Sequence, residues 1–155
     1  GADMWVQMSV NTILFDSRNS SYIIVLRDES GKKLLPIWIG ASEGNSIALA
    51  MSNVKPTRPL THDLLIGIFD RLDVEISRVV ISDLIDSTFY ASLYLLHNNK
   101  EVHIDSRPSD AIALAMRTGA PVFVEEEVLS KQDSSAIDTW MKNFGESGGG
   151  TEYNA

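Results

Sequence analysis

Short apolar runs alternate with polar turn segments along most of this chain. The pattern predicts three strands near its start, Trp5–Phe15, Tyr22–Leu26 and Leu34–Ile39, because β-branched, aromatic and other apolar residues gather there between clusters of Ser, Asn, Asp and Gly. Residues Ser42–Ser52 then change to small and aliphatic types and predict a helix. The first part of the chain therefore has the order β-β-β-α.

The same order returns after a connector at Val54–Pro59, where two prolines oppose a helix. Thr61 is the expected N-cap of a further helix, whose apolar positions recur at helical spacing. The strands, the turn and the helices expected after it are Val74–Ile81, Asp83–Ser87 (turn), Phe89–Leu96, Glu101–Ile104, Ser106–Arg117 (helix), Val122–Val124 and Ser134–Phe144 (helix).

A short string repeats within these elements. Residues 47–51 and residues 112–116 both read Ile-Ala-Leu-Ala-Met, 65 positions apart, and both belong to helices that follow three strands. We interpret the chain as an α+β protein in which duplicated βββα units pack into one compact mixed-sheet domain, with a C-terminal helix. The expected boundaries are a domain at residues 5–130, a helical extension at 131–145 and a flexible tail at 146–155.

Composition narrows the function classes. The chain has 155 residues and no cysteine, which excludes disulfide scaffolds, thiol catalysis and cysteine-ligated zinc or iron–sulfur sites. No apolar run approaches the roughly 18 residues of a membrane span, and the start lacks a signal-peptide layout, so we expect a cytoplasmic protein with no membrane partner. The net charge of −8 argues against nucleic-acid binding through a broad, positively charged surface.

Two polar clusters stand at the starts of predicted helices. Residues 58–63 read Arg-Pro-Leu-Thr-His-Asp, and residues 105–110 read Asp-Ser-Arg-Pro-Ser-Asp. Carboxylates with an imidazole can hold a hard divalent cation that activates water, and arginines stabilise charge that develops on a phosphoryl group. If the fold brings the clusters together, they suit phosphodiester hydrolysis.

A plain structural interpretation stays open beside this one. Asp63 and Asp110 fall in the first turns of helices, where the helix dipole stabilises an acidic residue in any case. Thr61 and Ser109 are ordinary residues for a helix start, and the arginines of the two clusters can simply bridge to the aspartates. The chain contains no P-loop, no Gly-x-Gly-x-x-Gly motif and no His-Glu-x-x-His motif that would decide between the two.

Four motifs occur in order along the chain, at Leu35–Gly40, Arg58–Asp63, Thr88–Ala91 and Asp105–Ala115. Together they resemble the bifunctional nuclease domain family, long catalogued as a domain of unknown function, over about residues 5–130. The resemblance implies a compact α+β domain, commonly oligomeric, and an activity on DNA and RNA that is attributed to plant members. The family usually has alanine after its helix-start glutamate, whereas Gly44 follows Glu43 here, which predicts a looser helix start.

We therefore expect a nuclease that hydrolyses phosphodiester bonds of DNA or RNA with a divalent metal, Mg²⁺ or Mn²⁺, and that forms a homo-oligomer. The candidate catalytic residues are His62, Asp63, Asp105 and Asp110. The candidate phosphate-binding residues are Arg58, Arg107, Thr61 and Ser109, and the candidate metal ligands are Asp63, Asp105, Asp110 and Glu43. The alternative is a non-catalytic oligomeric binding module whose polar cleft binds an anion or a partner.

Overall fold

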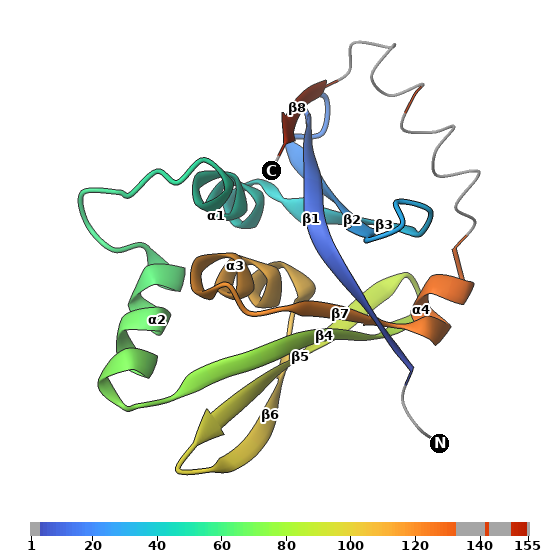
Figure 1. The fold of residues 1–155 in the computed structure, drawn as a ribbon. Helices are drawn as coiled ribbons and strands as arrows, with labels where there is room; N and C mark the ends of the chain where they lie inside the picture. Colours follow the sequence, from blue (N-terminus) through green and yellow to red (C-terminus); the bar gives the residue numbers. More distant parts are fainter. Residues whose placement is uncertain (1–3, 133–141, 143–149, 155) are drawn as a thin grey trace.

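Three antiparallel strands form the first part of the fold (Figure 1). The computed structural model describes residues 4–132, 142 and 150–154. Strands β1 (Trp5–Asp16), β2 (Ser21–Asp28) and β3 (Leu34–Gly40) make a meander, and helix α1 (Ala41–Met51) follows β3 without a linker. Because β3 runs directly into α1, the start of this helix is held against the edge of the sheet.

A second meander repeats this order. Strands β4 (Glu75–Ile85), β5 (Thr88–His97) and β6 (Lys100–Ser106) pair antiparallel and lead into helix α3 (Pro108–Thr118). Gly119 ends α3 with a φ of 78°, which costs glycine little because it has no Cβ. Helix α2 (Thr61–Arg71) lies between the two meanders in the sequence.

Strand β7 (Val122–Glu125) joins the two meanders into one mixed sheet. It pairs antiparallel with β1 and parallel with β4, so the strand order is β3-β2-β1-β7-β4-β5-β6. Helices α1 and α3 lie side by side, as Figure 1 shows, and α2 contacts α3. The starts of all three helices come from different parts of the chain and meet beside the same sheet.

The apolar core explains the alanine-rich helices. Residues Ala111–Ala115 of α3 are fully or almost fully buried between the sheet and α1. Gly44 of α1 is also buried, and a Cβ there would overlap the ring of Tyr22. The glycine that the sequence suggested would loosen the start of α1 therefore has a packing role, because it lets the helix approach β2 closely.

The α+β class and the main order of elements are confirmed, with local differences. The predicted turn at Asp83–Ser87 is shorter, since β4 continues to Ile85, and the N-cap of α2 is Leu60 instead of Thr61. Helix α4 (Glu126–Ser130) was not predicted. Strand β8 (Gly150–Asn154) pairs with β1 where a tail was expected. The predicted helix Ser134–Phe144 falls almost entirely outside the described residues.

The fold bears on two further expectations from the sequence, the duplicated units and the absence of a membrane span. The chain does contain a three-strand meander followed by a helix twice, but an origin by duplication stays a prediction. Within the part of the chain that the structure describes, no helix has the length and apolar character needed to span a bilayer.

Candidate active site

One buried imidazole connects the three helices. His62, in the first turn of α2, is 8% exposed. Its Nδ1 lies 2.7 Å from the hydroxyl of Ser46 on α1, and its Nε2 lies 2.9 Å from Oδ1 of Asp110 on α3. Both ring nitrogens are thus hydrogen-bonded, which fixes the orientation of the ring and places its Nε2 edge against a carboxylate.

Arg107, the residue before α3, binds two of the carboxylates around this imidazole. Its Nε donates to Oδ2 of Asp110 at 2.9 Å, its Nη2 to Oδ1 at 3.3 Å, and its Nη1 to Glu43 on α1 at 3.0 Å. The hydrogen bonds to Asp110 and Glu43 raise the pKa of Arg107. A guanidinium has five N–H donors, so this side chain, 63% exposed, keeps two donors for an incoming anion.

A second arginine binds the other predicted aspartate. Arg117, in the last turn of α3, donates from Nε to Oδ1 of Asp63 at 2.9 Å. Its Nη2 also donates to the Ser46 hydroxyl at 3.0 Å and to the Ser46 carbonyl at 3.3 Å. The side chain is 12% exposed, so Asp63 is held inside a structural ion pair.

The carboxylates of this network are held in their ionised form. Burial alone would raise the pKa of Asp110, but hydrogen bonds from Arg107 and His62 lower it below its usual value. The pKa of Asp63 is lowered by the backbone N–H of Leu60 and then by Arg117, and that of Glu43 by its own backbone N–H and then by Arg107. An ionised Asp110 can only accept, so the Nε2 atom of His62 carries the proton between them.

An open hollow of about 250 Å³ gives access to this network. His62, Asp110 and Arg107 line it together with Glu43 and Thr61. A second hollow of about 310 Å³ shares Glu43 and Arg107 as its wall and continues past β3. The exposed guanidinium therefore stands between two connected surface depressions.

The predicted site residues separate into two groups. The structure brings together His62, Asp110, Arg107, Glu43 and Thr61. Ser109 is buried at the start of α3 and lines the second hollow, whereas Asp63 lines a different hollow beside Arg117. Arg58 is exposed in the connector before α2, and Asp105 is exposed on β6 opposite Ser92, so neither lines the hollow around His62.

The candidate metal ligands do not converge. Asp63 is paired with Arg117, Asp110 and Glu43 are both paired with Arg107, and Asp105 lies apart on β6. Among the residues with a described placement, no three carboxylate or imidazole side chains are grouped as metal ligands would be. These side chains, as arranged, do not fit a preformed divalent-metal site.

Two members of the network were missed by the sequence analysis. Ser46 and Arg117 fall in the middle and at the end of helices that read as core, and each has a role only because α1 and α3 are adjacent. The repeat at residues 47–51 and 112–116 was the available signal for that adjacency. Ser46 directly precedes the first string, and Arg117 directly follows the second.

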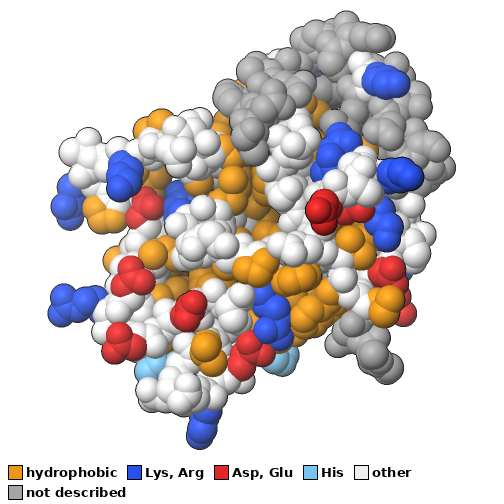
Figure 2. All heavy atoms as spheres, in the orientation of Figure 1, with side chains coloured by type: hydrophobic (Ala, Val, Ile, Leu, Met, Phe, Trp, Pro, Cys, Tyr) orange, Lys and Arg blue, Asp and Glu red, His pale blue; other side chains and the backbone are white. Residues whose placement is uncertain are grey.

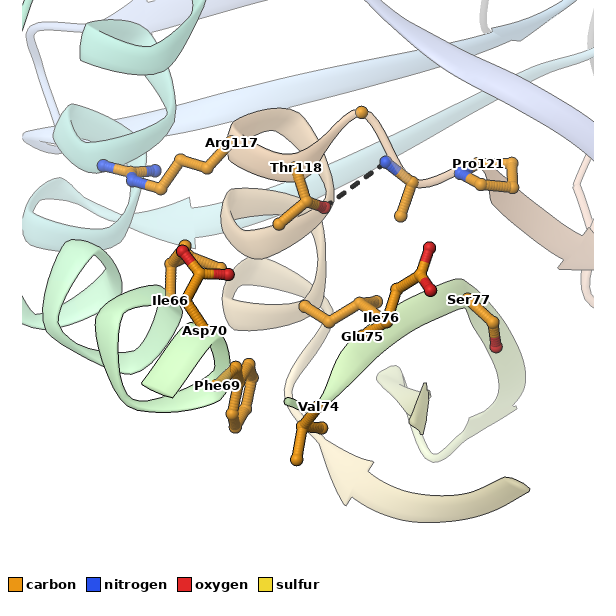
Figure 3. Close-up of a pocket in the computed structure, with 12 residues that line it drawn as sticks. Ile66, Phe69, Asp70, Val74, Glu75, Ile76, Ser77, Arg117, Thr118 and Pro121 are labelled. Carbon is orange, nitrogen blue, oxygen red and sulfur yellow. Dashed lines mark hydrogen bonds between the residues drawn. The ribbon is translucent and has the colours of Figure 1, made fainter. Parts of the chain in front are cut away.

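Another hollow, of about 470 Å³, lies between α2, the end of α3 and β4 (Figure 3). Asp70 and Glu75 stand at its wall, and the hydroxyl of Thr118 accepts a hydrogen bond from the backbone of Ala120. It contains none of the residues that the sequence selected as a site. The face of the molecule drawn in Figure 2 shows basic side chains scattered among acidic ones, with no continuous basic band.

Fold and site together define a compact α+β domain in which three helix starts surround a carboxylate–imidazole–guanidinium cluster open to solvent. The chain matches the model of the bifunctional nuclease domain over residues 24–136. That match covers more than half of the chain, and the chain belongs to the bifunctional nuclease domain family. The matched region contains every residue of the cluster.

The similar proteins include bacterial and plant members. An uncharacterized protein of Mycobacterium tuberculosis is 43% identical over 109 residues, which are 70% of this chain and 65% of that protein. Bifunctional nuclease 1 of Arabidopsis thaliana is 33% identical over 120 residues, 75% of this chain and 37% of the plant protein. Bifunctional nuclease 1 of Oryza sativa subsp. japonica is 29% identical over 111 residues, 69% of this chain and 34% of the rice protein. The chain thus spans about two thirds of the bacterial relative and about a third of the plant relatives.

Proposed function

We propose that this protein hydrolyses phosphodiester bonds of DNA or RNA at the hollow around His62. Family membership and the names of the plant relatives support a nucleic acid as the substrate. The observation that carries the proposal is the grouping of His62, Asp110 and an exposed Arg107 around one open hollow. This set contains an anion-binding group and a proton-transfer pair within hydrogen-bond reach of one another.

In the proposed mechanism the free donors of Arg107 bind the non-bridging oxygens of the scissile phosphate and stabilise the charge that grows on them. Asp110 accepts the proton of the attacking water as the water oxygen bonds to phosphorus, while the bond from phosphorus to the leaving sugar oxygen breaks and that oxygen takes a proton from solvent. His62 donates from Nε2 to Oδ1 of Asp110 and orients this carboxylate. Ser46 holds the opposite side of the ring at 2.7 Å and so keeps Nε2 directed toward Asp110. Side chains of this protein supply every group used in these steps.

The second hollow fits the rest of a nucleotide. Its walls include the apolar side chains of Ile39, Phe89 and Pro108, and it begins at Arg107. A phosphate at Arg107 would leave one neighbouring sugar or base next to these apolar walls. Aromatic and apolar surfaces bind nucleobases with little sequence preference, which agrees with activity on more than one kind of nucleic acid.

The test is cleavage of plasmid DNA and of a single-stranded RNA by the purified protein, with Mg²⁺, with Mn²⁺ and with a chelator. His62→Ala should lower the cleavage rate about 100-fold, because Asp110, the general base, loses the side chain that orients it. Asp110→Asn is a variant of nearly the same shape and should lose about as much if the fold is intact by circular dichroism. His97→Ala, at the exposed end of β5, serves as the matched control. Folded His62→Ala protein with unchanged activity would overturn the mechanism.

A non-catalytic anion-binding module is the second candidate. The observation in its favour is that each carboxylate near the hollow already has an arginine partner, which resembles a structural network. This alternative predicts binding of phosphate or an oligonucleotide that depends on Arg107, with no cleavage under any of the conditions above.

A further inference from the structure

Arg117, in the last turn of α3, extends across to α1, as Figure 3 shows. Its Nη2 donates to the hydroxyl of Ser46 at 3.0 Å, and this hydroxyl lies 2.7 Å from Nδ1 of His62. On the other side of the ring, Nε2 lies 2.9 Å from Oδ1 of Asp110. Four side chains from three helices therefore form one continuous chain of hydrogen bonds that ends at the candidate active site.

The direction of each bond in this chain follows from the groups at its two ends. A guanidinium has no acceptor, so Arg117 can only donate and the oxygen of Ser46 accepts. The Ser46 hydroxyl has one hydrogen, and within the described part of the chain the acceptor that it reaches is Nδ1 of His62. Nδ1 therefore carries no proton. At the other end, the ionised Asp110 can only accept, so the single ring proton lies on Nε2.

Burial makes the opposite arrangement at Nδ1 unfavourable. Ser46 is 6% exposed and His62 is 8% exposed, so water has little access to replace a lost protein partner. If Nδ1 carried a proton, the Ser46 oxygen would accept from both His62 and Arg117, and its own hydrogen would lose its acceptor. A buried hydroxyl without an acceptor is costly. Arg117 thus opposes protonation of a ring nitrogen that it does not touch.

We propose that Arg117 is a positioning residue that acts through Ser46 to keep His62 neutral, with its proton on Nε2. The proposal rests on the proposed function, in which Asp110 is the general base. A neutral imidazole donates one hydrogen bond to Asp110 and orients it. A doubly protonated imidazolium would form a full ion pair with Asp110 and make this carboxylate a weaker base toward water.

Charge alone offers a simpler explanation that a test must separate from the hydrogen-bond chain. Asp110 and Asp63 both interact electrostatically with His62, and each attracts positive charge to the ring. The two guanidinium groups of the cluster oppose them. Arg117 therefore acts on the ring by its charge as well as through Ser46. Ser46 has no charge, so its removal interrupts the chain and leaves the surrounding charges in place.

Nitrogen-15 NMR of the full chain at about pH 7 tests the proposal, because ring nitrogens with and without a proton differ clearly in chemical shift. The signals of His62 are those that disappear in His62→Gln. In the wild type, Nε2 should carry a proton and Nδ1 should not. In Ser46→Ala and in Arg117→Met, a doubly protonated ring should appear at the same pH while circular dichroism stays unchanged.

Two variants match these changes on the opposite meander. Ser77→Ala removes a hydroxyl that bonds to Glu101, and Arg78→Met removes an ion-paired arginine that is 24% exposed. Both should leave the signals of His62 unchanged, and a doubly protonated ring in either control would overturn the assignment to the chain.

Three NMR results would overturn the proposal. The first is a wild-type ring with a proton on Nδ1. The second is a ring that stays as in the wild type in both Ser46→Ala and Arg117→Met. The third is a change in Arg117→Met alone, which would assign the effect to charge. If Arg117→Met does not fold, Ser46→Ala decides the matter by itself.

Cleavage kinetics separate this proposal from the proposed function. Ser46→Ala should lower kcat about tenfold with KM for the nucleic acid nearly unchanged, because Arg107 still binds the phosphate. A loss confined to KM would overturn the positioning role. A wild type that shows the expected ring state but never cleaves would refute the proposed function, whereas cleavage by a protein whose Nδ1 is protonated would refute the hydrogen-bond chain alone.

Discussion

The two ends of α3 carry arginines that bind carboxylates in different surroundings. Arg107, before the helix, holds Asp110 and Glu43 with a side chain that is 63% exposed. Arg117, in the last turn, holds Asp63 with a side chain that is 12% exposed. It also bonds to the Ala113 carbonyl and to the Ser46 hydroxyl. Nearly the same ion pair is therefore open to an anion at one end and closed at the other. In the proposed function, exposure to solvent decides which end binds a ligand.

The largest effect on stability is expected at the closed end. Arg117→Met should lower the free energy of unfolding by about 3 kcal/mol, because Asp63 and the Ser46 hydroxyl lose their partner inside the structure. Urea denaturation measures the change. Lys100→Met, at the exposed start of β6, should change stability by less than about 0.5 kcal/mol. An equally small loss for Arg117→Met would show that the two ends do not differ as described.

At the open end the expected loss is in activity. Arg107→Gln should lower the cleavage rate constant divided by KM about 100-fold, because a donor to the transition-state charge is removed. Its cost in stability should stay below about 1 kcal/mol, since exposed ion pairs contribute little. Full activity in a folded Arg107→Gln protein would assign phosphate binding to another group. A large loss in the free energy of unfolding would show that Arg107 stabilises the fold as Arg117 does.

Glu43→Gln sharpens the function of the open end. The variant removes a negative charge that lies 3.0 Å from Nη1 of Arg107 and weakens the competition for that guanidinium. Affinity for inorganic phosphate should rise several-fold, which a titration followed by NMR can measure. Glu29→Gln, in the exposed turn after β2, removes the same charge at a distant position and controls for the net charge of the chain. Equal increases in both variants would mean that only the overall charge matters.

The sequence predicted the polar clusters better than it predicted their partners. Asp63 and Asp110 were correctly placed in first turns, because capping and helix-dipole preferences are local. That Asp110 meets His62 while Asp63 meets Arg117 depends on how α1, α2 and α3 pack against one another. Arg58 and Asp105 adjoin their cluster partners along the chain, yet the connector and β6 carry them away from the hollow. Proximity in sequence therefore grouped residues that the fold places in different surroundings.

The same limit applies to the fold. Apolar alternation located the strands because burial of one face of a strand is visible over a few residues. The connection of the two meanders through β7, antiparallel to β1 and parallel to β4, has no local sequence pattern, since it depends on partners far apart in the chain. Gly44 is an example at a single position. Only glycine fits there, because a Cβ would overlap the ring of Tyr22 on β2, a contact that the sequence around Gly44 does not reveal.

The smallest expected effect is the acid dependence of the closed end. Arg117 and the Leu60 backbone lower the pKa of Asp63 in the folded protein, so the stability that this carboxylate contributes is present above its unfolded pKa and is lost as the pH falls through the folded value. The unfolded value for an aspartate is about 3.9, so the stability difference between wild type and Arg117→Met should stay constant above about pH 5. The stability difference should then narrow as the pH is lowered toward about 2 to 3. Urea midpoints measured at several pH values test this. A difference that does not change with pH would mean that Arg117 stabilises the fold through Ser46 and packing, with its charge on Asp63 contributing little.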